Sequence, residues 1–205
     1  MPARVYVFWD NSNIFIPAQD VAARRDGLAE RSAVRLQFDN LFRLAVMGRP
    51  IANAFCVGSV PPDLGKVWKR LRVDTGANIE LYERGHDSGT EQAIDQALQV
   101  SMLRALADED EPQVAVLMTG DGAGYLDGVG FHADLERMHR RGWGIEVLSW
   151  DESCNARLKD WARKAGVYVP LEMYYWQITF IEGGRFSKPP KFTNRALARP
   201  RSASY

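Results

Sequence analysis

Two short apolar runs, Val5–Trp9 and Gln113–Met118, constrain the fold of this chain more than any other feature. Each run is closed at once by turn-forming polar residues, which begin with Asp10 after the first run and end with Asp121 after the second. Continuous runs of this kind are typical of strands that are covered on both faces, as in the centre of a parallel sheet. Because ligands of open α/β sheets bind at the carboxyl ends of the strands, we expect both aspartates to lie at a functional edge of such a sheet.

Extended and helical patterns alternate along most of the chain, which predicts right-handed βαβ crossovers and an α/β fold with a central parallel sheet. The predicted strands cover residues 5–9, 51–57, 78–82, 113–118 and 145–150, with a short edge strand at 167–169. The predicted helices cover part of 17–35 and all of 37–47, 63–74, 91–107, 131–141 and 153–164, the last of these with Ser153 as its cap.

The pattern changes after the last of these helices. The aromatic run Tyr174–Ile181, a Gly183-Gly184 turn and Arg185-Phe186 predict a β-hairpin. Beyond Lys188 the chain is basic, contains proline and has few apolar residues, which predicts an irregular or disordered tail. We therefore divide the chain into a domain at 1–170 and a C-terminal extension, made of the hairpin and the basic tail, at 171–205.

Composition excludes several classes of protein. The 205 residues carry 26 basic and 26 acidic side chains, so the chain is not a globally basic nucleic-acid binder. Hydrophobic residues make up 46%, and no apolar run reaches the roughly 20 residues of a membrane span. The two cysteines, Cys56 and Cys154, give no disulfide framework, and we expect no signal peptide before the first strand, so a cytoplasmic protein is the simplest interpretation.

Acidic residues from three segments converge in the predicted fold. Asp10 and Asp121 follow neighbouring central strands, while Glu91 and Asp95 lie one turn apart at the start of a helix. Clustered carboxylates repel one another unless a divalent cation compensates, and Mg²⁺ and Mn²⁺ prefer carboxylate oxygens and water. The alternative is that these acids are separate helix caps and solvent-facing side chains, because Asp10 or Ser12 would also suit the cap of the next helix.

Three motifs follow one another in the chain: Phe8-Trp-Asp-Asn-Ser-Asn-Ile14, Gly89-Thr-Glu-Gln-Ala-Ile-Asp-Gln-Ala-Leu98 and Leu117-Met-Thr-Gly-Asp-Gly122. Together they resemble the motifs of the NYN family, a branch of the PIN-like metal-dependent ribonucleases, with a layout that covers about residues 4–170. The resemblance implies a Rossmann-like, three-layer PIN-like domain with endonuclease activity on RNA. It also implies metal ligands at Asp10, Asp95 and Asp121, with Asn13 as a supporting contact and Glu91 as a fourth candidate.

Two positions depart from the family pattern. The family helix usually carries a further aspartate where this chain has Ser101, and the second aspartate of the Gly-Asp-x-Asp motif falls at Ala123. The glycine-rich stretch that follows looks like an insertion. Within it, Asp127 either replaces the missing carboxylate or is a turn residue beside Gly128. With one outer carboxylate missing, the site would hold one ion, or bind RNA without cutting it.

We predict an endoribonuclease that uses Mg²⁺ or Mn²⁺ to hydrolyse RNA, single-stranded by preference, and leaves a 3′-hydroxyl and a 5′-phosphate. The aromatic residues Tyr174–Trp176 either stack on bases or pack on the sheet or on a second subunit, so self-association through the hairpin is a further prediction. The supporting polar residues are Asn11, Asn13 and Thr119. The candidate RNA-binding residues are Arg84, His86, Arg185, Lys188 and Lys191.

Three other functions compete with this one. A catalytically weakened RNA-binding or regulatory protein would keep the fold without the chemistry, and Ser101 and Ala123 favour it. A dinucleotide-binding module is suggested by the glycines of Gly128–Ala133 and by Asp151, although about nine residues separate these glycines from the preceding strand. A haloacid-dehalogenase-type phosphatase would need an acid where the chain has Ser12.

Overall fold

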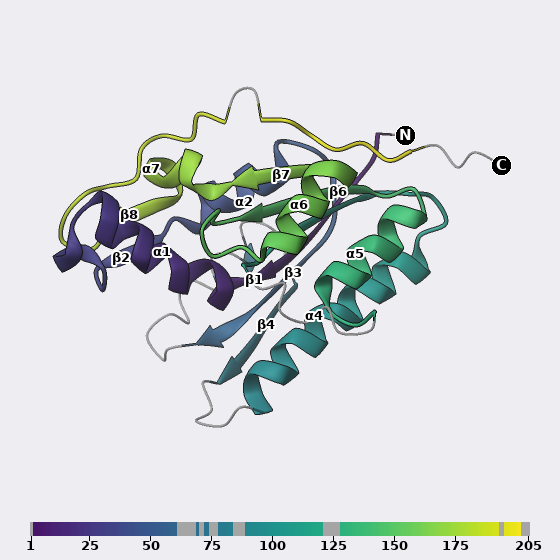
Figure 1. Cartoon of the computed structure of the whole chain (residues 1–205), viewed down its shortest axis with the longest axis horizontal. Helices are drawn as coiled ribbons and strands as arrows, with labels where there is room; N and C mark the ends of the chain where they lie inside the picture. Colours follow the sequence, from purple (N-terminus) through teal and green to yellow (C-terminus); the bar gives the residue numbers. More distant parts are fainter. Residues whose placement is uncertain are drawn as a thin grey trace.

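The main sheet holds six parallel strands, and helices cover both of its faces (Figure 1). In this computed structural model the strand order is β4-β3-β1-β5-β6-β7, and β2 pairs with β8 in a second, antiparallel sheet. The structure describes residues 2–60, 69, 72–73, 78–83, 89–120, 128–192 and 195–201, and it describes only the backbone of residues 58–60, 78–83 and 89–95.

The elements of the described residues have the following bounds. The strands are β1 Val5–Asp10, β2 Val34–Leu36, β3 Ile51–Val60, β4 Asn78–Glu83, β5 Val114–Met118, β6 Gly144–Ser149, β7 Val167–Pro170 and β8 Thr179–Ile181. The helices are α1 Asn11–Arg25, α2 Phe38–Val46, α4 Gly89–Asp108, α5 Phe131–Arg140, α6 Ala156–Ala165 and α7 Tyr175–Ile178, with 3₁₀ turns at Leu28–Glu30 and Leu171–Tyr174.

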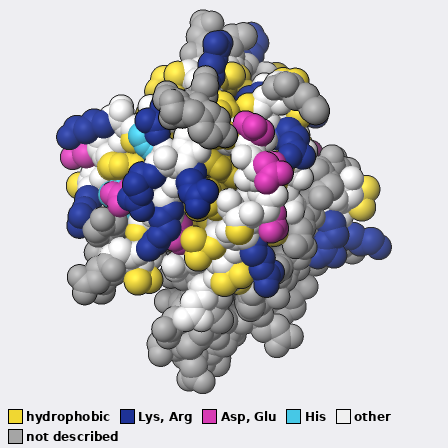
Figure 2. All heavy atoms as spheres, turned by 90° about the vertical axis from the view of Figure 1, so that its right-hand side faces the viewer, with side chains coloured by type: hydrophobic (Ala, Val, Ile, Leu, Met, Phe, Trp, Pro, Cys, Tyr) yellow, Lys and Arg dark blue, Asp and Glu magenta, His cyan; other side chains and the backbone are white. Residues whose placement is uncertain are grey.

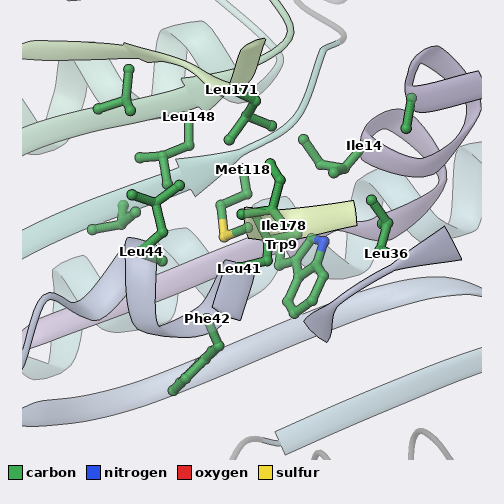
Figure 3. Packing of buried hydrophobic residues seen from close by; sticks show 14 of the residues in the cluster. Trp9, Ile14, Leu36, Leu41, Phe42, Leu44, Met118, Leu148, Leu171 and Ile178 are labelled. Atoms are coloured by element: carbon green, nitrogen blue, oxygen red, sulfur yellow. The ribbon is translucent and has the colours of Figure 1, made fainter. Parts of the chain in front are cut away.

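The side chains of β1 alternate between two hydrophobic clusters, as the pleat of a strand requires. Val5, Val7 and Trp9 join the cluster that α1, α2 and the C-terminal segment cover, and Tyr6 and Phe8 join the cluster under α4, α5 and α6. Burial on both faces explains why β1 and β5 are continuously apolar in sequence. The predicted core position of Trp9 is confirmed, since its side chain is 1% exposed and lies in the middle of the first cluster (Figure 3).

The predicted parallel sheet is confirmed, and so is the expected pairing of the first strand with the strand that ends near residue 118. β1 lies between β3 and β5, with Trp9 opposite Met118 and Asp10 opposite Val57. The short edge strand predicted at 167–169 is β7. Because every pairing in this sheet is parallel, the carboxyl ends of β1, β3 and β5 meet at one edge.

The stretch 17–35 is helical in part, as predicted, but the helix begins before it and a strand begins at its end. α1 begins at Asn11, directly after β1, and ends at Arg25, while residues 34–36 form β2. The Asp10 side chain caps α1 by accepting a hydrogen bond from the Asn13 backbone N–H, so the helix begins without an intervening loop. Pro17 lies inside α1, where it leaves one backbone carbonyl without its helical donor.

The predicted C-terminal hairpin is wrong. Residues 171–178 form helical turns, and the strand partner of β8 is β2. One backbone bond, from the Ile181 N–H to the Arg185 carbonyl, joins β8 to the residues after the Gly183-Gly184 turn. Tyr175 and Ile178 are both fully buried, three residues apart, which is helical spacing. Burial of these two side chains against the first cluster decides the conformation over the β-propensity of an aromatic run.

The end of the chain has no regular structure, as predicted, but the described part of it is docked on the sheet. Arg195 is buried and donates a 2.5 Å hydrogen bond to Glu146 of β6, which also forms an ion pair with Arg49. Arg201 donates its backbone N–H to the Gly142 carbonyl at 2.7 Å. Of the two alternatives predicted for this tail, irregular or disordered, residues 195–201 are irregular, and they lie along the side of the sheet where the strands begin.

The amphipathic helix predicted at 63–74 lies almost entirely outside the described residues. No helix in the described part of the chain is long and apolar enough to cross a membrane.

Candidate functional site

Asp10 is buried at the carboxyl edge of the sheet, as predicted, and it also caps α1. Its side chain is 1% exposed. One carboxylate oxygen accepts the Asn13 backbone N–H at 3.2 Å, and the other accepts the Asn13 side-chain amide at 2.5 Å. The two interpretations of this residue, helix cap and edge carboxylate, are therefore both correct. Asn13 fixes the orientation of the carboxylate in this position.

Three segments meet beside Asp10 at Gly120, which follows β5. A Cβ atom at this position would lie 3.2 Å from the Asn13 carbonyl oxygen and 3.3 Å from Ser153 Oγ. Because Gly120 has no side chain, α1 can approach the end of β5 closely. The Asn13 carbonyl at this contact is the one that Pro17 leaves without a helical donor. Thr119, one of the predicted supporting residues, is fully buried at the same edge.

The loop after β6 completes this side of the edge, which the sequence pattern does not predict. The Gly120 carbonyl accepts the Asn155 backbone N–H at 3.2 Å. Asn155, and not Ser153 as predicted, caps α6 through bonds from the N–H groups of Arg157 and Leu158. Asn is as good a cap as Ser, and the signal that could have found it is its place directly before the helical spacing of α6.

Asn11, the second predicted supporting residue, is 7% exposed. No donor among the described residues reaches its side-chain oxygen. A buried carbonyl oxygen without a donor is costly in a folded protein unless a ligand or an ion satisfies it. This oxygen belongs to the residue next to Asp10, at the first position of α1.

The charge of Asp10 acts on a neighbouring side chain. Burial raises the pKa of the Cys56 thiol well above its usual value, and the negative charge of Asp10 raises it further. Cys56 is on β3, opposite Trp9. The Cys56 thiol beside Asp10 therefore stays protonated.

The other predicted acids are only partly placed. Glu91 and Asp95 belong to the first turns of α4, whose backbone is described and whose side chains at these positions are not. α4 follows β4, so it begins at the same edge of the sheet, and it packs against β1 and β3. Asp121, Asp127, Arg84 and His86 lie outside the described residues.

Ser101 replaces the further aspartate of the family helix. Its side chain is 5% exposed, and its hydroxyl donates to the Ala97 carbonyl of α4 at 3.0 Å. Within the described residues, no group of three His, Cys, Asp or Glu side chains is placed to hold a metal ion. A metal site at this edge therefore depends on acids whose side chains are not described.

The predicted basic residues of the C-terminal segment lie far from Asp10. Arg185 donates hydrogen bonds to Asp26, at the C-terminal end of α1, and to Thr179. The 15-residue α1 separates this ion pair from Asp10 by roughly 24 Å at 1.5 Å per residue. Lys188 and Lys191 are exposed on the same segment. The described arginines of the tail, in contrast, belong to the opposite side of the molecule, where the chain ends and where basic and acidic side chains are mixed (Figure 2).

The glycines that suggested dinucleotide binding lie at the start of α5, as the spacing predicted, and not directly after β5. Gly130 precedes the first residue of α5 and donates its backbone N–H to the Gln99 side chain at 3.3 Å. The Gly128 carbonyl accepts a hydrogen bond from Arg137 at 2.6 Å. A pyrophosphate needs backbone N–H donors, and the Gly130 N–H, which this turn would offer, already donates to a protein side chain.

The fold and the edge together define an α/β domain of the three-layer, PIN-like kind, with a buried aspartate at the carboxyl end of its central strand. Residues 4–166 match the family model of the NYN domain. The chain belongs to the NYN domain family, and the resemblance predicted from its motifs is confirmed. At the level of the family, this places it among PIN-like nucleases.

Comparison with solved structures supports the fold alone. A crystal structure of a protein of unknown function from Vibrio parahaemolyticus is similar, with a TM-score of 0.58 and 14% sequence identity. The similarity covers 83% of this chain and 93% of that one. No curated protein matches the chain.

Proposed function

We propose that the protein is a metal-dependent endoribonuclease that hydrolyses phosphodiester bonds of single-stranded RNA. The observation that carries the proposal is the position of Asp10. In a chain of the NYN family, this carboxylate is buried at the carboxyl end of the central strand, beside the end of β5, and is oriented by Asn13. The proposed metal ligands are Asp10, Asp95 and Asp121, with Glu91 and Asp127 as further candidates.

The described donors suit Mg²⁺ or Mn²⁺. Asp10 supplies carboxylate oxygens, Thr119 supplies a hydroxyl, and the buried Asn11 oxygen has no donor in the described part of the chain. All of these are hard oxygen ligands, which these two ions prefer, whereas zinc selects cysteine and histidine. The three histidines of the chain are at positions 86, 132 and 139, and the two described ones are on α5, where both contact the Trp161 ring.

A bound ion of this kind would lower the pKa of a water molecule and neutralise charge on the phosphate. Asn13 holds the Asp10 carboxylate with two donors, so its oxygens face a fixed direction. Gly120 keeps the end of β5 within reach of α1, which brings Asp10 and the end of β5 together. Asp10, Asp95 and Asp121 together would exclude other anions from the edge until a cation is present.

Cleavage of labelled single-stranded RNA tests this proposal. Wild-type protein should cut the RNA in the presence of Mn²⁺ and stop when the metal is chelated, and Asp10→Asn should lose nearly all of this activity. Asp20→Asn is the matched control, because this substitution removes the same charge from α1. Asp20 lies on the exposed side of the helix, where it pairs with Arg31. Equal cleavage by wild type and Asp10→Asn would show that the site is wrong.

One observation favours a second function, a catalytically weakened RNA-binding or regulatory protein. Ser101 stands where the family helix usually has an aspartate, and its buried hydroxyl is bonded to its own helix. A site with fewer carboxylates binds cations less strongly. Under this second function, wild-type protein would bind RNA, and Mn²⁺ would produce no cleavage.

Two properties stay predictions. The cytoplasmic location inferred from the cysteines agrees with the finding that Cys56 and Cys154 are both free and buried. Self-association was predicted through a C-terminal hairpin, and the structure has no such hairpin. Sedimentation of the purified chain would measure self-association directly.

A further inference from the structure

The segment after β8 holds an aromatic ring out into solvent. Phe186 is 88% exposed, more than any other large hydrophobic residue of the described chain. Lys188 and Lys191 follow it and are exposed as well. We call these three residues the Phe186 ridge. In Figure 1 the ridge belongs to the segment that leaves β8, on the side of the molecule opposite the chain ends.

The backbone on both sides of Phe186 is fixed. The Arg185 guanidinium contacts Asp26 with two nitrogens, at 3.1 and 2.9 Å, and also donates to the Thr179 carbonyl at 2.9 Å. The Arg185 carbonyl accepts the Ile181 N–H at 2.7 Å, and the Lys188 N–H donates to the Trp176 carbonyl at 2.6 Å. Phe186 is therefore exposed on a constrained loop, and binding a partner would cost little conformational entropy.

Cations, rather than acids, surround the ridge. From Arg185 to the end of the chain there is no acidic residue. Asp26, which contacts this segment, is paired with Arg185, and Glu182, which precedes it in the chain, is paired with Arg35. Lys188 lies over the Trp176 ring, 5.3 Å from its centroid, with its ammonium at the surface. Among the described residues, neither lysine has an acidic partner. An exposed ring beside such lysines suits a ligand that has flat bases and a phosphate backbone.

We propose that the Phe186 ridge binds single-stranded nucleic acid, by stacking a base on Phe186 and placing backbone phosphates near Lys188 and Lys191. This inference rests on the proposed function, because it assigns the ridge to the flank of the RNA that the Asp10 edge cuts. Along α1 the two places are roughly 24 Å apart. At a spacing of about 3.4 Å per stacked nucleotide, this corresponds to about seven nucleotides.

Binding of fluorescent single-stranded RNA in chelator tests the ridge without any cleavage. Phe186→Ala should weaken binding of RNA longer than about seven nucleotides by roughly 5- to 150-fold, the usual range for one stacked base. Phe186→Trp should keep the wild-type affinity. Changing both lysines to glutamine should reduce the slope of log affinity against log salt by about 1.4, since each phosphate contact contributes about 0.7 on single strands.

Leu28→Ala is the matched control. Leu28 is 79% exposed and follows Asp26 by two residues, so it shares this end of α1, but it has no ring on which a base could stack. An unchanged affinity in Leu28→Ala with a loss in Phe186→Ala supports the ridge. Equal affinity of Phe186→Ala and wild type for long RNA would overturn it.

A protein partner is the other class of ligand for an exposed apolar side chain, and it predicts a different outcome. If the surface docks a second copy of the chain, Phe186→Ala and Leu28→Ala would both change the sedimentation of the protein and neither would change RNA affinity, which overturns the proposal. The inference and the proposed function fail separately. RNA cleavage without dependence of binding on Phe186 removes the ridge alone, and ring-dependent binding without Mn²⁺-dependent cleavage removes the nuclease alone.

Discussion

Asp10 ends β1 and begins α1, and a single carboxylate serves both elements. The sequence could predict the residue and its place at the edge of the sheet, because an apolar strand that ends in polar residues has few other interpretations. It could not predict how the carboxylate is held. Two donors of Asn13 hold it. The approach of α1 to the end of β5 depends in addition on Gly120 and Asn155, whose contacts exist only in the folded chain.

At this scale we predict that Asn13→Ala weakens Mn²⁺ binding by about 10- to 100-fold, the usual cost of losing a residue that orients a metal ligand. The variant removes the 2.5 Å bond from the amide to Asp10 and leaves the backbone cap in place, so the protein should still fold. Calorimetric titration with Mn²⁺ measures the effect. Asn53→Ala is the control, since that side chain accepts a bond from its own β3 backbone neighbour and makes no other hydrogen bond among the described residues. An Asn13→Ala variant with wild-type Mn²⁺ affinity would remove Asn13 from the site.

At the scale of the elements, strands of continuous apolar residues and helices with clear spacing were predicted to within a few residues. The short and amphipathic elements were not. β2 has only three residues, and its pairing with β8 is a contact between positions more than 140 residues apart. The hairpin prediction failed because the run from Tyr174 to Ile181 fits a strand by propensity, while Tyr175 and Ile178 are buried on one side of a helical turn.

The contact between α1 and the C-terminal segment is pH-dependent. Burial by itself would raise the pKa of Asp26, but hydrogen bonds and charge from Arg185, together with the Tyr175 hydroxyl, bring it below 3.8. A carboxyl group whose pKa is lower in the folded state than in the unfolded state stabilises the fold at pH values above its unfolded-state pKa. This stability is lost as the pH falls through its folded-state pKa. In the opposite direction, burial and Asp26 raise the pKa of Tyr175 to about 12, so its contribution is lost as the pH rises from 10 towards 12.

We therefore predict that Asp26→Asn lowers the free energy of unfolding by about 1.5–3 kcal/mol near neutral pH, the usual range for hydrogen bonds to a charged group. The difference from wild type should shrink as the pH falls below 3.8. Urea unfolding at several pH values measures both effects. Asp20→Asn, which breaks an exposed ion pair, should cost less than about 1 kcal/mol. A deficit in Asp26→Asn that stays constant into acid would contradict this assignment.

At the scale of the whole molecule, the division at residue 170 depends on whether the C-terminal segment is an addition or a part of the core. Leu171, Tyr175, Ile178 and Ile181 are buried in the same cluster as Trp9. Sequence could not reveal this, because the partners of these residues lie in β1, α1 and α2.

A chain that ends at Pro170 should for this reason be unfolded or insoluble. It loses four buried side chains worth about 1.5–3 kcal/mol each, a total comparable to the roughly 5–15 kcal/mol that stabilises a whole domain. Far-ultraviolet circular dichroism with thermal melting compares it with the full chain, and a chain that ends at Phe192 is the control that keeps the cluster. Cooperative melting of the 1–170 chain at the full-length temperature would show that the domain is self-sufficient.

The central claim is that the carboxyl edge at Asp10 holds a divalent cation, and a crystal of the full chain soaked in Mn²⁺ tests it most directly. We predict an anomalous difference peak at a distance of about 2.0–2.2 Å from an Asp10 carboxylate oxygen, with oxygen ligands from the Asp95 and Asp121 segments around it. The protein in the crystal must be shown to cut RNA in a Mn²⁺-dependent manner. If such a crystal has no peak at Asp10, or has manganese bound only elsewhere, the claim is contradicted.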